Sequence, residues 1–215
     1  MQPIRIFFEK RGRAKYISHL DLMRAMSRAV RRAALPLWYT EGFNPHPYLA
    51  FPLPLPLGQE GLREAMDLRL VADMPFAEIQ ARLNEVLPEG LRVLHVAEPW
   101  NKPGEIKAAR YSIKLPCEDP QAFATQAELA LKEGKLTAKK MGKQGRRKVE
   151  KEIALAPLII TYDLHTEEHR MVMDCVLAAG SEVNLNPALL IGALGAEQMS
   201  ITRVALLRGD GQAWE

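Results

Sequence analysis

The chain has 215 residues, of which 47% are hydrophobic and 26% charged, and a formal net charge of +3. This composition is that of an ordinary globular protein with one large or two small domains. The absence of an apolar run of about 18 residues, and of a signal-like N-terminus, predicts a cytoplasmic protein without a membrane span. Cys117 and Cys175 have no second Cys or His at ligand spacing, so we expect no disulfide framework, metal or cofactor in this chain.

The N-terminal region predicts a strand followed by a capped helix. The run 4–9 (IRIFFE) is rich in β-forming residues, and Ser18 with Asp21 fits a variant of the capping box. Pro36 is expected to end the helix. Helical spacing predicts a buried face and a neighbouring basic face. The buried face would contain Met23, Met26, Val30 and Ala33, and the basic face Arg24, Arg28, Arg31 and Arg32.

The following elements complete a βαββαβ pattern. Two strand-like arms flank a loop, and a strand, an amphipathic helix and a further strand come after them. Their ranges are 37–40 and 48–51 for the arms, 42–47 for the loop, 65–72 for the strand, 75–87 for the helix and 91–96 for the last strand. This order is typical of a ferredoxin-like unit.

The pattern then starts again after a linker that contains Pro-Gly. We expect a strand at 111–115, a helix at 120–131 and two or three strands between 136 and 177. A short helix at 187–194, a closing strand at 201–207 and a loose tail at 209–215 would follow. The predicted fold class is therefore α+β, with tandem ferredoxin-like (βαββαβ) units and antiparallel sheets. The N-terminal unit would cover 1–100 and the C-terminal unit 108–208.

The segment EGFNPHP, 41–47, is the sharpest local signal for a site. Pro45 and Pro47 stiffen the chain on both sides of His46, and Asn44 offers both a donor and an acceptor. Because histidine titrates near neutral pH, His46 could contact a ligand or move a proton. The alternative is a rigid turn in which His46 packs and bonds to the backbone.

Other candidate ligand-binding residues lie near the start of the helix and on the third strand. His19 is at the positive end of the helix dipole, which disfavours imidazolium, and Tyr16 lies just outside the cap. Asp67 and Glu64 are three residues apart in a strand and should face opposite sides, which argues against a shared metal site. The candidate ligand-binding set is Tyr16, His19, Asn44, His46 and Asp67; no metal site is predicted and no catalytic residue is assigned.

Basic charge is concentrated in two segments. Residues 5–32 contain nine Lys or Arg and two acidic residues, and residues 132–151 have the same balance, so the rest of the chain is acidic. Clustered basic charge on an acidic body is typical of proteins that bind a polyanion such as RNA, although it can also be a solvated face. The candidate nucleic-acid-binding residues are Lys10, Arg11, Arg13, Arg24, Arg28, Arg31, Lys139, Lys140, Lys143, Arg146, Arg147 and Lys148. The second segment, 139–151, is predicted to be a mobile basic hairpin.

Prolines alternate with apolar residues in FPLPLPLG, 51–58. Proline cannot donate a backbone hydrogen bond, so the segment must be an edge or an irregular extended strand. It could protect a sheet edge from aggregation, or it could form the rim of a protein-binding surface.

Several of these stretches resemble a known bacterial family. KYISHLDLMRAMSRAVRRAALPLWYTEGFNPHP, LAFPLPLPLG and EAMDLRL, with a weaker match at SEVNLNPALLI, are similar to the radical SAM-linked (radical SAM-associated) proteins of unknown function. The resemblance implies a separate radical SAM protein as partner, and this chain lacks the Cys-x3-Cys-x2-Cys run that would hold the cluster. A more distant similarity to RNA-processing proteins of CRISPR systems fits the fold, but their C-terminal glycine-rich loop is missing here.

Three functions are open at this point. The first is an accessory protein that binds RNA, or a ribonucleoprotein, for a separate radical SAM enzyme. The second is a protein-interaction module of a radical SAM complex that makes no RNA contact. The third is an RNA-processing enzyme in which His19 and His46 act as acid and base; whether the chain is an enzyme is left open.

Overall fold

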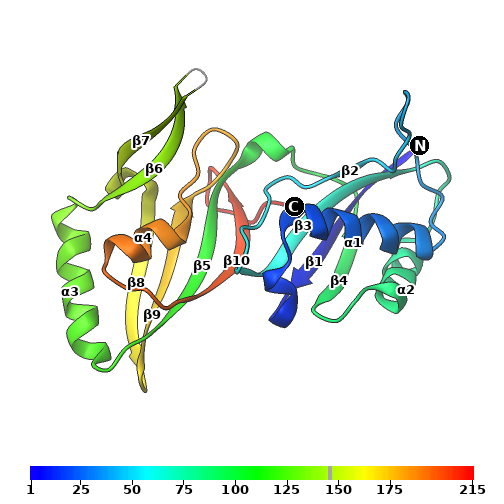
Figure 1. Cartoon of the computed structure of the whole chain (residues 1–215). Coiled ribbons are helices and arrows are strands. Elements are labelled where there is room, and N and C mark those ends of the chain that lie inside the picture. The colour runs from blue at the N-terminus through cyan, green and yellow to red at the C-terminus, as the bar shows by residue number, and fades with distance from the viewer. Residues whose placement is uncertain (145–146) are drawn as a thin grey trace.

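The computed structural model describes the backbone of residues 1–144 and 147–215 and the side chains of 1–139 and 150–215. The first half of the chain forms four strands, two α-helices and a short 3-10 helix, η1 (Figure 1). They are β1 (Gln2–Lys10), η1 (Gly12–Tyr16), α1 (His19–Arg32), β2 (Leu49–Ala50), β3 (Glu60–Leu70), α2 (Phe76–Val86) and β4 (Leu91–Ala97). The predicted strands and helices of this half are present with two exceptions: the arm at 37–40 makes only isolated bridges, at Leu37 and Tyr39, and β2 is only two residues long.

The second half has six described strands and two α-helices. They are β5 (Ile106–Pro116), α3 (Pro120–Glu133), β6 (Thr137–Gln144), β7 (Arg147–Ala154), β8 (Ile159–Glu167), β9 (Arg170–Ala178), α4 (Pro187–Ala193) and β10 (Ser200–Arg208), with short 3-10 helices at Pro103–Glu105 and Ala156–Leu158. Four strands lie between 136 and 177, where the sequence predicted two or three. The additional pair arises because β6 and β7 form a separate two-stranded sheet.

One sheet runs through both halves. Its order is β4-β1-β3-β10-β5-β9-β8, with β2 paired to β3. Every pairing is antiparallel except that of β3 with β10, which is parallel and short, joining Glu60 and Gly61 to Thr202 and Arg203. The α+β class with a mostly antiparallel sheet is therefore confirmed.

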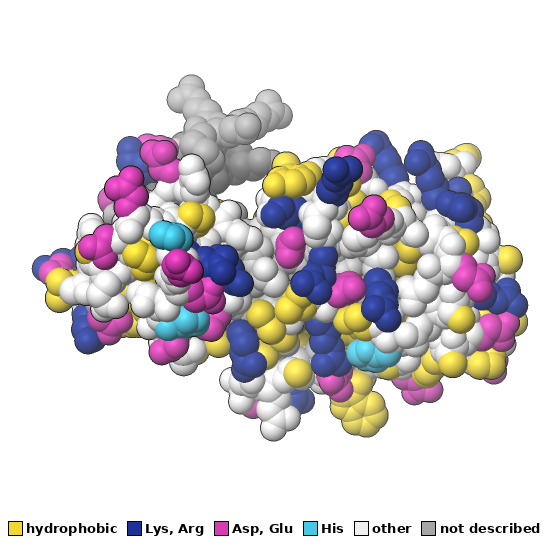
Figure 2. All heavy atoms as spheres, turned by 90° about the horizontal axis from the view of Figure 1, so that it is seen from below, with side chains coloured by type: hydrophobic (Ala, Val, Ile, Leu, Met, Phe, Trp, Pro, Cys, Tyr) yellow, Lys and Arg dark blue, Asp and Glu magenta, His cyan; other side chains and the backbone are white. Residues whose placement is uncertain are grey.

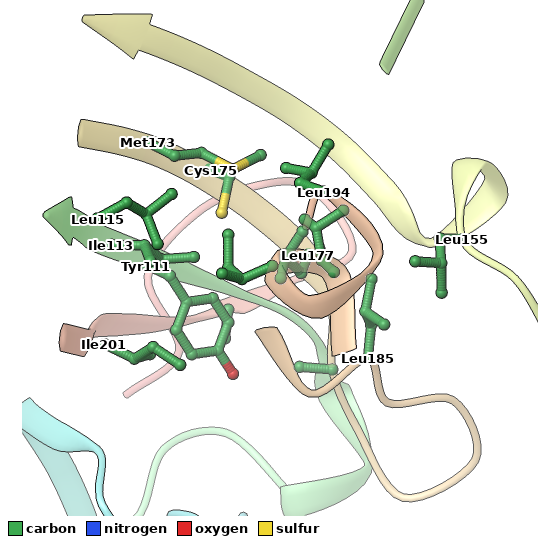
Figure 3. Close-up of a cluster of buried hydrophobic side chains, with 14 of the residues drawn as sticks. Tyr111, Ile113, Leu115, Leu155, Met173, Cys175, Leu177, Leu185, Leu194 and Ile201 are labelled. Atoms are coloured by element: carbon green, nitrogen blue, oxygen red, sulfur yellow. The ribbon is translucent and has the colours of Figure 1, made fainter. Parts of the chain in front are cut away.

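Each half has its own apolar core on the side covered by its helices. In the first half, α1 and α2 pack against Ile4, Ile6 and Phe8 of β1. In the second half, α3 and α4 pack on alternate residues of β5 and β9. Figure 3 shows Ile113 of β5 and Cys175 of β9 among the side chains of this core. Burial raises the pKa of Cys175 to about 12, so this thiol is a core residue and not a reactive group.

Helix α1 begins as the sequence predicts, but its buried face is rotated slightly. Ser18 Oγ accepts a hydrogen bond from the Asp21 backbone N–H at 3.1 Å. The predicted core residues Met26, Val30 and Ala33 are buried, whereas Met23 is only half-buried. Leu22 and Ala29 complete the buried stripe, which is the set expected when i, i+4, i+7 and i+8 positions face a sheet.

A buried ion pair joins the helix-covered sides of the two halves. Arg203 on β10 donates from Nε to Glu64 on β3 at 2.9 Å, makes a second bond to the same carboxylate, and both side chains are at most 5% exposed. Tyr111, whose ring lies in the second core with its hydroxyl pointing out of it (Figure 3), also contacts the guanidinium. A Cβ at Gly61 would overlap the Glu64 carboxylate, which explains the glycine there.

The proline-rich segment 51–58 crosses this junction as a strap and not as a strand. Phe51 packs against the first core and Leu53 against the second. The Leu53 carbonyl accepts a 2.7 Å hydrogen bond from Arg203, and Gln59, just after the strap, donates to Asn186 at 2.9 Å at the start of α4. The sequence predicted an edge or an irregular extended strand, whereas the segment forms no strand, and its position between the two cores was not predicted.

The tail, predicted to be loose, is ordered. Ala213 pairs with Leu207 of β10, and the Trp214 backbone N–H donates to the Leu206 carbonyl at 2.9 Å. Trp214 is buried beneath the Arg5 guanidinium, which lies 3.8 Å from the ring centroid. The prediction from composition was wrong because a single tryptophan anchors this segment to a distant strand.

Candidate nucleic-acid interface

Two of the predicted ligand-binding residues, Tyr16 and His19, lie at the N-terminal end of α1. The His19 ring packs edge-on against Phe51 with centroids 5.2 Å apart, and its Nδ1 has no hydrogen-bond partner among the described residues. Tyr16 and the nearby Leu20 are exposed. The Gly58 N–H donates to the Lys15 carbonyl at 2.8 Å, which brings the end of the strap, with exposed Leu57, beside them.

Asn44 and His46 lie in a hairpin that follows the other end of α1. Tyr39 bridges to Pro47, and the Thr40 N–H donates to the His46 carbonyl. His46 Nδ1 is 2.9 Å from the Asn44 carbonyl and 3.2 Å from Thr40 Oγ1. One ring nitrogen is therefore engaged within the turn, as the rigid-turn interpretation expected, while the side chain as a whole is exposed.

These two groups of residues do not share a site. The hairpin is anchored to the C-terminal end of β3, where the Trp38 N–H donates to the Arg69 carbonyl, whereas His19 lies by the opposite end of that strand, near Gly58. α1 has 14 residues, which corresponds to a length of about 20 Å between the two ends. Asp67 binds Arg5 through two hydrogen bonds of 2.7 and 2.8 Å and is not a free ligand.

Burial removes two cations from the N-terminal basic cluster. Lys10 is 1% exposed and lies within 3.4 Å of the carbonyls of Lys15 and Ile17, and Arg5 is equally buried. Burial lowers the pKa of Lys10. Lys10 therefore does not contact a nucleic acid, and its place in the predicted set is corrected. Arg11 and Arg13 are exposed, with Arg11 3.8 Å from Glu9.

The arginine face of α1 is at the surface. Arg24, Arg28 and Arg31 follow each other at intervals of four and three and are all exposed. Arg24 pairs with Asp21 at 3.0 Å; within the described part of the chain, no ion pair involves Arg28 or Arg31. Arg28 and Arg32 also line a groove of 370 Å³ between α1 and the C-terminal end of α2, where Glu85, Val86, Leu87 and Pro88 form the other wall.

The second basic cluster lies mostly beyond what the structure describes. Lys139 is exposed on β6 and pairs with Glu150 at 3.1 Å. The side chains of Lys140, Lys143, Arg146, Arg147 and Lys148 lie outside the described residues. Figure 2 shows Lys and Arg side chains interspersed with acidic ones on the face seen from below, and denser over the N-terminal half on the right.

An aromatic cluster that the sequence interpretation overlooked lies in the same hairpin as His46. The Trp38 and Tyr48 rings meet at 65° with centroids 6.1 Å apart, and the Arg69 guanidinium lies 5.5 and 4.8 Å from them. Phe43 at the tip is fully exposed. Four of the 14 aromatic residues fall between positions 38 and 48, which was a usable signal in the sequence.

Two histidines should make the stability of the fold depend on pH. Burial, and then the charge of Lys10, lowers the pKa of His19; burial, and then Arg63, lowers the pKa of His95, which stacks on Phe7 at 4.4 Å. In the unfolded chain both rings take up protons near pH 6.5, where the folded protein still holds them neutral. The free energy of unfolding should therefore fall as the pH decreases from about 7.5 to about 5.5.

Urea unfolding at both pH values would measure this loss. Replacing His19 and His95 together by glutamine should make it smaller. His165→Gln with His169→Asn, at exposed positions around the β8–β9 turn, is the matched control and should leave the loss unchanged. An equal loss in the first variant and in the wild type would show that these two rings do not cause it.

A family model described as "Uncharacterized protein conserved in bacteria (DUF2344)" matches residues 3–187. No curated protein matches the chain. In the described part of the chain, no helix is long and apolar enough to cross a membrane.

Two solved structures have a partly similar backbone. One chain of a Cbf5-Nop10-Gar1 complex is 9% identical with a TM-score of 0.49; the alignment covers 94% of this chain and 48% of that one, so the chain spans about half its length. An unknown protein from Galdieria sulphuraria is 11% identical with a TM-score of 0.28, and the alignment covers 95% and 99% of the two chains. At these scores neither structure bears on the function.

Proposed function

The chain belongs to DUF2344, a family of uncharacterized proteins conserved in bacteria, and we propose that it is an accessory protein that binds RNA for a separate radical SAM enzyme. The observation that carries the RNA part is the row Arg24, Arg28 and Arg31 on α1. These guanidinium groups point to solvent from a helix that is fixed by a cap and a buried stripe. They therefore present phosphate-binding groups at defined intervals.

The charge of this row is available for a ligand. An exposed arginine in an ion pair gives up only a small interaction energy when a ligand replaces its carboxylate partner. An unpaired arginine gives up none. Arg28 and Arg31 form no ion pair among the described side chains, and Arg32 adds a third guanidinium at the groove beside α2, whose other wall contains one carboxylate, that of Glu85. This grouping favours a polyanion over a single small anion.

The partner part of the proposal rests on the resemblance to radical SAM-linked proteins and on an apolar patch. Tyr16, Leu20 and Leu57 are each more than 60% exposed and lie together at the N-terminal end of α1. Contiguous exposed apolar groups are typical of protein interfaces. The radical SAM enzyme would bind there, at the opposite end of α1 from Arg31.

The scaffold in this proposal consists of two ferredoxin-like units. The first half has the strand order β4-β1-β3-β2, and the second half has the equivalent order β10-β5-β9-β8, with β6 and β7 inserted. Each order is that of a βαββαβ unit in which all neighbours are antiparallel. The two units would share a sheet through β3 and β10.

The test is filter binding of fragmented total RNA to the purified protein. We expect saturable retention whose affinity falls steeply as salt is raised from about 50 to about 200 mM, because bound phosphates release counterions. Absent retention, or retention independent of salt, would contradict the RNA part.

Co-purification with the radical SAM protein from the same bacterium, before and after nuclease treatment, tests the partner part. The complex should survive nuclease and be lost in Leu20→Glu. Survival of the complex together with absent RNA retention would favour a second candidate, a protein-interaction module without RNA contact.

The enzyme hypothesis receives less support. It needs His19 and His46 in one site, and they lie at opposite ends of α1 and β3. A general acid and base must both reach the reacting atoms.

A further inference from the structure

We propose that the hairpin from Trp38 to Tyr48 is a base-stacking element and that the ligand of this protein is single-stranded RNA. The inference rests on the proposed function, because it names the form of RNA that the same surface would bind. Arg28 and Arg31 would hold phosphates, and the rings of Phe43 and Tyr39 would stack on unpaired bases.

The tip of the hairpin presents an aromatic ring to solvent at little entropic cost. Phe43 is fully exposed, which is unusual for a large apolar side chain. Gly42, at φ 124°, adopts a backbone conformation that other residues resist, and Pro45 restricts the chain two residues after Phe43. The Thr40 N–H to His46 carbonyl bond, at 2.9 Å, and the His46 Nδ1 contacts close the loop. Because the loop is already restrained, ligand binding should cost little further conformational entropy there.

The base of the hairpin is anchored to the sheet. Trp38 and Tyr48 pack against each other and against the Arg69 guanidinium, and the Trp38 N–H donates to the Arg69 carbonyl. Cation–π contacts of this kind hold both rings on the side of β3 that bears Arg69. The hairpin is thus a supported projection, and its exposed tip is not the consequence of an unattached loop.

The hairpin and the arginine row lie at the same end of the first half. Only five residues separate Arg32 from Trp38, and the Val71 N–H bonds to the Pro36 carbonyl, which fixes this connection against the end of β3. In Figure 1 the hairpin projects beside the N-terminus, at the end of the molecule where α1 finishes. Alternation along the arm puts Tyr39, which is half-exposed, on the same side as Leu37, which packs into the core under α1.

This combination favours single strands over duplexes. In A-form RNA the bases are stacked on one another, and the major groove is too deep and narrow for side chains to read. An exposed phenyl ring gains nothing from such a surface, whereas a splayed base can stack on it. Arginines alone would bind both forms, so the aromatic tip is what separates them.

Fluorescence anisotropy with a labelled single-stranded RNA of mixed sequence, and with the same strand annealed to its complement, tests the inference. The wild-type protein should bind the single strand more tightly. Phe43→Ala should weaken binding of the single strand by about fivefold or more with little change in the salt slope, and Phe43→Trp should restore it. Because Phe43 contacts nothing in the core, these variants should keep the wild-type melting temperature.

The outcomes separate this inference from the proposed function. Equal binding of both RNAs, with Phe43→Ala unchanged, would overturn the single-strand inference and leave RNA binding intact. Loss of the radical SAM complex in Phe43→Ala, with RNA binding unchanged, would also overturn it by making the tip a protein contact. No binding of either RNA would overturn the proposed function itself.

Discussion

Replacing Arg203 with alanine should lower the free energy of unfolding by about 3–5 kcal/mol, because it breaks a buried ion pair. The change leaves the Glu64 carboxylate in the junction between the two halves without a cationic partner on β10. It also removes the donor that holds the Leu53 carbonyl of the strap. A buried, unpaired carboxylate is far more costly than a buried pair.

Urea unfolding of the purified variant measures this effect. Arg110→Ala on the neighbouring strand is the matched control, because Arg110 is exposed and its loss should change stability by no more than about 0.5 kcal/mol. The double variant Arg203→Met with Glu64→Leu should recover part of the loss, since it removes the Arg203 charge and its partner together but leaves the buried Lys10 ammonium without the carboxylate that raises its pKa. A loss below about 1 kcal/mol in Arg203→Ala would show that the pair does not hold the halves together.

Reversing the charge of Arg28 and Arg31 should weaken RNA binding by at least about 25-fold at about 0.1 M salt. Each phosphate contact to a single strand contributes about 0.7 to the slope of the logarithm of the association constant against the logarithm of salt concentration. Two lost contacts contribute about 1.4, which at about 0.1 M salt lowers the association constant by about 25-fold relative to about 1 M. Repulsion from the new carboxylates adds to this loss. Arg28→Glu with Arg31→Glu is the variant, and anisotropy with the single-stranded RNA is the measurement.

The control must have the same change in net charge at another place. Arg110→Glu with Lys114→Glu meets this condition, because both side chains are exposed on β5 in the second half. It should bind RNA nearly as well as the wild type. If both double variants lose the same affinity, binding depends on net charge alone, and the α1 surface is not the interface.

The local elements were predictable because their signals lie within a few residues. The Ser18–Asp21 cap, the helical spacing in α1 and α2, and the alternation in β3 and β4 all act over one or two turns or a few residues of strand. They were enough for the α+β class and for most of the order of elements, but not for the separate β6–β7 pair. They also predicted that Asp67 and Glu64 face opposite sides of β3, and the two carboxylates bind different arginines.

The long-range contacts were not predictable in this way. Glu64 and Arg203 are 139 residues apart, and Trp214 packs on Arg5 from the far end of the chain. Lys10 continues the alternation of Ile4, Ile6 and Phe8 onto the core side of β1, but the predicted strand ended at residue 9, so this signal was not used. The sequence placed His19 at the start of the helix and His46 beyond its end, so a shared site required the loop to fold back along the whole of α1. Local signals do not report such a long-range contact, and the structure does not form it.

The salt dependence of single-stranded RNA binding, compared between the wild type and Arg28→Gln with Arg31→Gln, tests the central claim most directly. If these arginines bind phosphates, the slope of the logarithm of the association constant against the logarithm of salt concentration should decrease in magnitude by about 1.4. Identical slopes for the two proteins would contradict phosphate binding by α1, whatever the change in affinity.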